Sequence, residues 1–284
     1  MKVLMAESLG FCFGVREALA MAQQTGDPES VTIHGELVHN PLVLHRLEML
    51  GFHMASEPER QQLPATPRVM ITAHGVSDRE RQRLQGAGLR LIDTTCPLVR
   101  RAHRAAQNLA AEGRHILVIG RAGHVEVQGI VEDLPSVEVV ESAAKVRPSP
   151  HSRLGIICQT TTAPALVEEI VSAIRAANPQ ADIAFVDTVC QPTRDRQEAV
   201  RRLLPAVDGM VVVGGRNSNN TKELVALCQA ASKPAWHVQS AGDLQPEWFR
   251  DCRVIGLTAG TSTLDETIEA VRQSLLCLEG CDGA

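Results

Sequence analysis

Residues 91–97 read LIDTTCP and residues 185–192 read FVDTVCQP, so an apolar run ends twice in the pattern Asp-Thr-x-Cys. Short apolar runs of this kind are typical of buried strands. Each run is followed by a segment with the pattern of a helix, which comes soon after Cys96 in one copy and after Cys190 in the other. Two cysteines in the same local setting suggest that both do the same job.

The segments that follow these cysteines also repeat. A helix is expected after each cysteine, then an apolar strand, which reads HILVIG at residues 115–120 and GMVVVG at residues 209–214. The same order follows Cys12, with a helix expected at residues 15–24 and the strand VTIHGE at residues 31–36. The pattern therefore occurs three times along the chain.

A second strand is expected in each copy, and it begins with Arg, continues apolar and ends in small polar residues. These strands read RVMITAHGVS at 68–77, RLGIICQTTT at 153–162 and RVIGLTAGTS at 253–262. The third copy lacks a strand before a cysteine, and the N-terminal stretch MKVLMAESLGFC has the required form. We therefore expect this stretch to complete the third copy.

Alternating strands and helices predict an α/β fold with mainly parallel sheets. The threefold repeat predicts three similar α/β modules in a pseudo-threefold ring, or trefoil. The expected boundaries are residues 13–96, residues 97–189, and residues 190–276 together with 1–12, followed by a tail at 277–284.

The composition excludes several functional classes. The 284 residues are 44% hydrophobic and 21% charged, which predicts a globular protein with a core. A net charge of −5, with 2% aromatic residues and no Tyr, argues against nucleic-acid binding. No apolar run approaches the roughly 20 residues that span a membrane, and the N-terminus lacks a signal-peptide pattern. We expect a cytoplasmic protein, in which cysteines serve metal binding or redox chemistry more often than disulfides.

In a ring of three modules, Cys12, Cys96 and Cys190 would meet near the centre. An iron–sulfur cluster with three protein ligands suits them, because it leaves one iron open to a substrate. Packing is the second reading, because buried Cys is a common small hydrophobic residue. Structural zinc is the third, because it usually takes four ligands, often in closely spaced pairs. The remaining cysteines do not recur across the modules and are expected to be packing or tail residues; they are Cys158, Cys228, Cys252, Cys277 and Cys281.

Polar residues follow the strands at the same edge. His39, His74 and His124 each come after a strand, and the runs at 217–221 and 260–262 each precede a helix. Such runs act as helix caps or as anion sites, because a helix N-terminus presents free N–H groups. Together with the histidines they suit a phosphate or diphosphate. The chain has no nucleotide-binding glycine motif.

Two further candidates concern proton transfer. Glu126 lies two residues after His124 and is either a solvated loop carboxylate or a proton donor beside the proposed centre. Thr160 and Thr161 could position or pass a proton. Asp93 and Asp187 also lie near the centre, but a capping role before the helix is expected for both.

These residues, taken in order, resemble the LytB/IspH family of 4-hydroxy-3-methylbut-2-enyl diphosphate reductases over nearly the whole chain. The motifs are GFCFGV (10–15), VHN (38–40), AHGVS (73–77), DTTCPLV (93–99), GHVEV (123–127), QTT (159–161), DTVC (187–190), NSNNT (217–221) and TAGTS (258–262). Small departures are Val125 where the family often has Pro, Cys158 where it often has a hydroxyl residue, and Asn219 where many members have Ser.

The resemblance implies a [4Fe–4S] cluster on Cys12, Cys96 and Cys190, whose fourth iron binds the substrate hydroxyl. It implies Glu126 as proton donor, with Thr160 and His124 beside it. It implies a substrate site formed by His39, His74, His124, Thr161, Ser218, Asn219, Asn220 and Ser262.

The reaction implied is a two-electron removal of the allylic hydroxyl as water. It yields isopentenyl and dimethylallyl diphosphate, the last step of the non-mevalonate isoprenoid pathway, with electrons from ferredoxin or flavodoxin. Two other classes remain as alternatives. One is a non-catalytic iron–sulfur protein that carries electrons or senses redox state, and the other is a zinc-stabilised protein that binds a sugar or phosphate.

Overall fold

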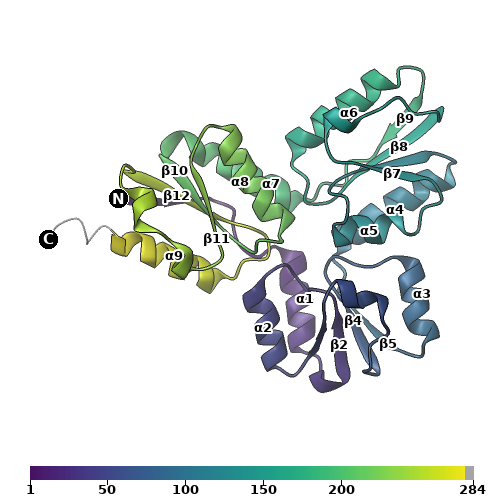
Figure 1. Cartoon of the computed structure of the whole chain (residues 1–284), viewed down its shortest axis with the longest axis horizontal. Coiled ribbons are helices and arrows are strands. Elements are labelled where there is room, and N and C mark those ends of the chain that lie inside the picture. Colours follow the sequence, from purple (N-terminus) through teal and green to yellow (C-terminus); the bar gives the residue numbers. More distant parts are fainter. Residues whose placement is uncertain (279–284) are drawn as a thin grey trace. The chain divides into compact units, whose positions relative to one another are not determined.

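The computed structural model of this chain describes residues 1–278, in which strands and helices alternate (Figure 1). The strands are β1 (Lys2–Met5), β2 (Val31–His34), β3 (His53–Ala55), β4 (Arg68–Ile71), β5 (Arg90–Asp93), β6 (His115–Ile119), β7 (Val137–Val140), β8 (Arg153–Cys158), β9 (Asp182–Phe185), β10 (Gly209–Val213), β11 (Ala235–Val238) and β12 (Val254–Ala259). The helices are α1 (Phe13–Gln23), α2 (Pro41–Met49), α3 (Asp78–Gly86), α4 (Pro97–Ala111), α5 (Val125–Val131), α6 (Pro164–Ala177), α7 (Gln191–Leu203), α8 (Asn219–Ala230) and α9 (Asp265–Cys277). In this part of the chain no helix is long and apolar enough to cross a membrane.

The chain divides into two compact units. Unit 1 comprises residues 1–13, 39–43 and those from 191 on, and unit 2 comprises residues 14–38 and 44–190. Unit 2 holds two four-stranded sheets, in the orders β3-β2-β4-β5 and β7-β6-β8-β9, and unit 1 holds the sheet β11-β10-β12-β1. All strand pairs in these sheets are parallel.

The prediction of three α/β modules with parallel sheets is confirmed, because each sheet has the same strand order along its module: second, first, third, fourth. In the third sheet the fourth place is taken by β1, which pairs with β12 in the register Leu4↔Gly256. The N-terminal stretch therefore completes this sheet, as the repeat predicts. The ring arrangement and the module boundaries stay predictions. Of the expected tail, Cys277 ends α9, and residues 279–284 lie outside the described residues.

Each sheet is covered on both faces, which explains why its central strands are apolar throughout. Along β10, Met210 and Val212 pack in one cluster with residues of α7 and α8. Val211 and Val213 pack on the other face with α9. The sheet of β6 is built the same way, with α6 on one face and α4 and α5 on the other. Helices on both faces of a parallel sheet are the doubly wound arrangement.

The sequence pattern did not predict one strand in each sheet. These are β3, β7 and β11, which pair with a neighbour on one side only. They have three or four residues and include His53, Glu138 and His237. A short edge strand that is partly exposed does not need a continuous apolar run, so it leaves little signal in the sequence.

Candidate functional site

The predicted site residues occupy equivalent places in the three sheets. Ligands bind open α/β sheets at the carboxyl ends of the strands, where the strand order reverses, and here the reversal lies between the first and third strands of each module. The loops after these strands carry His39 (after β2), His74 (β4), His124 (β6), Thr160 and Thr161 (β8), Ser218 with Asn219 and Asn220 (β10) and Ser262 (β12). The cysteines follow the fourth strands instead, with Cys96 after β5, Cys190 after β9 and Cys12 after β1.

The Asp-Thr-x-Cys turn before Cys96 is held by its own side chains. Asp93 Oδ1 accepts a hydrogen bond from the backbone N–H two residues on, at 3.0 Å. The Thr94 hydroxyl donates to the carbonyl of Ile71 on β4, at 2.6 Å. The Cys96 N–H donates to the carbonyl of Ala73, at 3.0 Å. Cys96 is thereby presented as the N-cap residue of α4, whose first residue is a proline with its φ already suited to a helix.

The second copy of the turn has the same bonds. Asp187 Oδ1 accepts from the N–H of Val189 at 3.1 Å, as Asp93 Oδ1 does from Thr95. Both aspartates therefore close the turn before the cysteine. The predicted role as a helix cap is wrong for Asp93, because the N-cap residue of α4 is Cys96. The Thr188 hydroxyl bonds to the N–H of Cys158 at 2.8 Å and to its carbonyl at 2.5 Å. The Cys190 N–H donates to the carbonyl of Thr160 at 2.9 Å.

Asp93 is ionised more readily than an ordinary aspartate. Burial raises the pKa of its carboxyl group, but hydrogen bonds from Arg81 and Thr95 outweigh burial, so the pKa lies below the usual value. Arg81 lies 2.6 Å and Arg100 lies 3.0 Å from Asp93 Oδ2. A charged aspartate keeps accepting the hydrogen bonds that shape the turn before Cys96.

Glycine makes room for the Cys96 thiol. A Cβ atom added to Gly14 on α1 would lie 2.5 Å from Cys96 Sγ, closer than any real Cβ contact. Cys12, Cys96 and Cys190 are thiols not joined in disulfides, and the first two are partly exposed. Three thiols at strand ends, one of them with space cleared beside it, fit an iron–sulfur cluster held by three protein ligands.

Glu126, Thr160 and Cys190 form one hydrogen-bonded set in unit 2. Glu126 is 1% exposed, and its Oε1 accepts from the backbone N–H of Thr160 at 2.6 Å. Its Oε2 accepts from the Thr160 hydroxyl at 2.9 Å. The carbonyl of Thr160 in turn accepts from the Cys190 N–H. The carboxyl group that sequence reasoning selected is therefore buried and aligned beside one of the predicted cluster ligands.

Two of the predicted site histidines, both in unit 2, meet edge to face. The ring centroids of His74 and His124 lie 5.7 Å apart with an interplanar angle of 85°. His124 is the N-cap of α5, and its Nδ1 accepts from the N–H of Glu126 at 3.2 Å. In the neutral ring this leaves the proton on Nε2, which can donate to an anion. Thr161 lies on the loop after β8, the strand next to β6, and its hydroxyl accepts from Gln159 Nε2 at 3.2 Å.

Unit 1 brings together a second polar group. Asn220 Oδ1 accepts from the N–H of Thr261 at 3.1 Å, and the carbonyl of Thr261 accepts from the Cys12 N–H at 3.1 Å. The Ser262 hydroxyl donates to the carbonyl of His39 at 3.3 Å. The close approach of this loop depends on Gly215, because a Cβ there would lie 2.2 Å from that same carbonyl. Cys12, His39, Asn220 and Ser262 are thus joined through short backbone links.

The start of α8 shows how its polar run works. Ser218 is the N-cap, and its hydroxyl oxygen accepts from the N–H of Thr221 at 3.3 Å. Ser218, Asn219 and Asn220 are all buried. Capping uses a lone pair of the Ser218 oxygen and leaves its hydroxyl proton to donate, so the capping and anion-binding readings of this run are compatible.

Sequence reasoning missed several residues that hold this group in place. Asn40 Nδ2 donates to the carbonyl of Ser262 at 2.6 Å, while its Oδ1 caps α2 through the N–H of Leu42 at 2.9 Å. The Thr193 hydroxyl accepts from Asn220 Nδ2 at 3.3 Å. For Asn40 a signal existed, since Asn immediately before a proline-led helix is typical of an N-cap. Thr193 carried no such signal. Gly14 belongs to the GFCFGV motif, but the motif did not indicate what the glycine is for.

The three predicted cluster ligands are divided between the units, with Cys12 in unit 1 and Cys96 and Cys190 in unit 2. Within each unit, over residues 1–278, no three His, Cys, Asp or Glu side chains are grouped closely enough to hold a metal ion. The complete ligand set and the joint site formed with the polar loops of both units stay predictions.

Comparison with known proteins agrees with these features. Residues 3–276 match the family model described as LytB protein. The chain is 35% identical over 274 residues to the 4-hydroxy-3-methylbut-2-enyl diphosphate reductase of Anaeromyxobacter sp. (strain Fw109-5), covering 95% of each protein. It is 34% identical to the enzyme of the same name from Aquifex aeolicus (strain VF5), covering 99% of this chain and 97% of that protein.

Two solved structures are similar. The E-1-hydroxy-2-methyl-but-2-enyl-4-diphosphate reductase of Plasmodium falciparum matches with a TM-score of 0.88 and 27% identity, over 96% of this chain and 87% of that one. A structure of (E)-4-hydroxy-3-methyl-but-2-enyl diphosphate reductase, described as the terminal enzyme of the non-mevalonate pathway, matches with a TM-score of 0.65 and 33% identity, over 97% and 99%. Because the family model matches residues 3–276, nearly the whole chain, the chain belongs to the LytB protein family.

Proposed function

We propose that this chain is a 4-hydroxy-3-methylbut-2-enyl diphosphate reductase. The reaction takes up two electrons and two protons, breaks the allylic C–O bond and releases the hydroxyl oxygen as water. The products are isopentenyl and dimethylallyl diphosphate. This is the activity named for the similar enzymes, which match this chain over 95–99% of its length.

The observation that carries the proposal is the buried carboxyl group of Glu126. A hydroxyl group leaves poorly as hydroxide and leaves well as water, so the reaction needs a positioned acid. Glu126 is held by two hydrogen bonds from Thr160, whose own carbonyl is bonded to the N–H of Cys190. We assign Glu126 as the proton donor to the leaving oxygen, with Thr160 as the residue that orients it.

Cys12, Cys96 and Cys190 would hold a [4Fe–4S] cluster. When bound, such a cluster supplies single electrons and, at an iron without a protein ligand, a Lewis-acid position. The chain's own contribution is to present each thiol after a fourth strand. For Cys96 and Cys190, threonine hydroxyl groups bonded to the neighbouring strand hold the turn.

The diphosphate is assigned to the polar residues that follow the strands. In unit 2, the rings of His74 and His124 meet edge to face, and the neutral His124 ring carries its proton on Nε2. In unit 1, Asn220 and the hydroxyl groups of Ser218 and Ser262 follow β10 and β12. The diphosphate is not cleaved, so its binding free energy serves to orient the allylic end toward the reacting groups.

The test is anaerobic reconstitution of the full chain with iron and sulfide, followed by assay with the allylic diphosphate and a chemical reductant. We expect brown protein with about four irons per chain and formation of both C5 diphosphates. Cys96→Ser should lose iron and turnover, and Cys277→Ser, at an exposed cysteine, should keep both. A colourless protein that binds zinc would overturn the proposal. A brown protein inactive toward the substrate would favour an electron carrier or sensor.

Ferredoxin or flavodoxin as the natural electron donor and a cytoplasmic location belong to the proposal as well. Replacing the chemical reductant with each purified carrier in the same assay tests the donor, and turnover with neither would reject both.

A further inference from the structure

The loop before Cys12 lacks the Asp-Thr pair that precedes the other two cysteines. Cys96 and Cys190 each follow an Asp-Thr pair whose side chains fix the turn. Before Cys12 the sequence is Glu-Ser-Leu-Gly-Phe, and Gly10 has a φ of +72°, a conformation that favours glycine. The Cys12 N–H still bonds to the neighbouring loop, at the carbonyl of Thr261. The turn itself needs another support.

A buried arginine supplies that support. Arg196 lies on α7 and is 5% exposed. Its Nη2 donates to the carbonyl of Gly10 at 2.5 Å, and its Nη1 donates to the carbonyl of Pro192 at 2.9 Å. One guanidinium group therefore binds the residue two positions before Cys12 and the residue two positions after Cys190.

We infer that Arg196 is the positioning residue for Cys12, taking the place that the Asp-Thr pair has at the other two cysteines. The planar guanidinium suits this role, because it offers several donors in a fixed geometry and stays charged. The inference rests on the proposed function only in treating Cys12 as a cluster ligand.

The Gly10 loop has little freedom to find another conformation. A Cβ on Gly10 would lie 2.9 Å from Ile268 Cδ1 and 3.2 Å from Asp265 Oδ1, so the loop already packs closely against the start of α9. Without the Arg196 donor the Gly10 carbonyl would lose a charge-assisted hydrogen bond in a confined place. We expect the loop to shift, and the Cys12 thiol with it.

The experiment compares two arginines of the same helix in the full-length chain. Arg196→Gln removes the charge and the fork, and Arg196→Lys keeps the charge but cannot bind both carbonyls in one plane. Arg201→Gln is the control, because Arg201 lies on the same helix and its side chain makes no hydrogen bond or ion pair with the described residues. Arg202 is unsuitable, because it pairs with Glu7 in the loop before Cys12. In metal-free protein, the alkylation rates of Cys12, Cys96 and Cys228 are followed separately by peptide mass spectrometry. In reconstituted protein, the rate of cluster loss to a chelator and the cluster's reduction potential are measured.

We expect alkylation of Cys12 in Arg196→Gln to rise roughly tenfold or more, as the loss of a hydrogen bond to a charged group predicts, while Cys96 keeps its parent rate. Arg196→Lys should give an intermediate rate, cluster loss should follow the same order, and the Arg196→Gln cluster should have a shifted potential. Arg201→Gln should match the parent throughout. A parent-like Cys12 rate in Arg196→Gln would overturn the inference.

If Arg196→Gln does not fold, the buried Cys228 will also be alkylated fast. The Arg196→Lys variant then replaces it, and a parent-like Cys12 rate in Arg196→Lys would overturn the inference. The alkylation arm needs no cluster, so its result is independent of whether the proposed function holds.

Discussion

Glu126 combines burial with two hydrogen bonds from a single residue, Thr160. Glu126→Gln keeps the size of the side chain but has no acidic proton to give. We expect turnover to fall by about 10²-fold or more, the lower range for a positioned acid, with iron content unchanged. Turnover is measured in the reconstituted enzyme, and Glu132→Gln, at the exposed end of the same segment, is the control. Near-normal turnover in Glu126→Gln would assign the proton to another group.

Asn220 has two tasks that substitution can separate. Its Oδ1 holds the N–H of Thr261, and its amide is assigned to the diphosphate. Asn220→Asp keeps the acceptor for Thr261 but adds a charge that repels the anion, so affinity for inorganic diphosphate should fall roughly tenfold to a hundredfold or more. Asn220→Ala should lose affinity and also stability, because the buried N–H is left without its acceptor. Calorimetric titration measures the affinity and thermal unfolding measures the stability. Asn108→Ala, at an exposed residue, is the control. Unchanged affinity in both variants would move the anion site elsewhere.

At the scale of elements, α1 packs closely against the start of α4 because residue 14 of α1 is a glycine. Gly14 lies within α1, where Ala would ordinarily favour the helix by about 1 kcal/mol. Gly14→Ala should nevertheless lower iron content sharply, because the new methyl group would occupy the space 2.5 Å from Cys96 Sγ. The measurement is iron per chain after reconstitution.

Gly86→Ala is the matched control for this prediction. Gly86 ends α3, and an added Cβ meets nothing within 4 Å. This variant should hold iron as the parent does and unfold at the same or a slightly higher temperature. Equal iron content in the two variants would show that the space beside Cys96 is not required.

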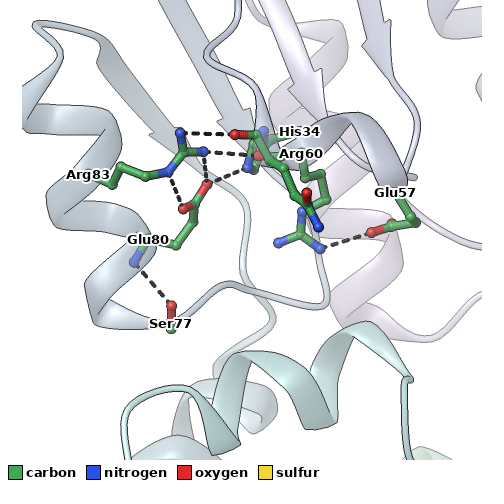
Figure 2. A network of polar contacts seen from close by, with 7 residues as sticks. His34, Glu57, Arg60, Ser77, Glu80 and Arg83 are labelled. Atoms are coloured by element: carbon green, nitrogen blue, oxygen red, sulfur yellow. Dashed lines mark hydrogen bonds and ion pairs between the residues drawn. The ribbon is translucent and has the colours of Figure 1, made fainter.

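For the molecule as a whole, stability should depend on pH through histidines that are buried without charge. His34 is fully buried at the end of β2, with Nε2 donating to Glu80 Oε1 at 2.7 Å, in a network with Arg60 and Arg83 (Figure 2). Burial and then Arg60 lower the pKa of His34 below 6.5, and Glu80 only partly opposes them. The unfolded chain therefore binds a proton at a pH where folded His34 does not.

The sign follows from this difference. Stability from His34 is complete above pH 6.5 and is lost as the pH falls toward the folded pKa, by at most about 1.4 kcal/mol per pH unit. The pKa of Glu80 is also lowered: burial raises it, but Arg83 and His34 outweigh burial, so its contribution is lost only in more acidic solution.

Urea unfolding at pH 7.5, 6.5 and 5.5 should show His34→Gln losing less stability on acidification than the parent. His103, His115 and His237, whose pKa values burial also lowers, should contribute further pH dependence of the same sign. Parallel pH profiles for variant and parent would remove His34 as a source.

The sequence by itself determined the three modules, their parallel sheets and the polar residues at the strand ends. Those features depend on local patterns: apolar runs, the Asp-Thr-x-Cys turn and its spacing to the next strand. The short edge strands β3, β7 and β11 escaped, because pairing with one neighbour demands few apolar residues. The edge strands β1, β5 and β9 are as short, and they were found because each leads to one of the three repeated cysteines.

Only the tertiary structure decided which residues support the site. Thr160 holds Glu126 from 34 residues away, and Arg196 reaches Gly10 across 186 residues. Gly14 is necessary only because the Cys96 side chain lies against it. Such contacts arise when distant strands are laid side by side and their loops meet at one edge. No local periodicity records them, because each partner on its own is an ordinary threonine, arginine or glycine.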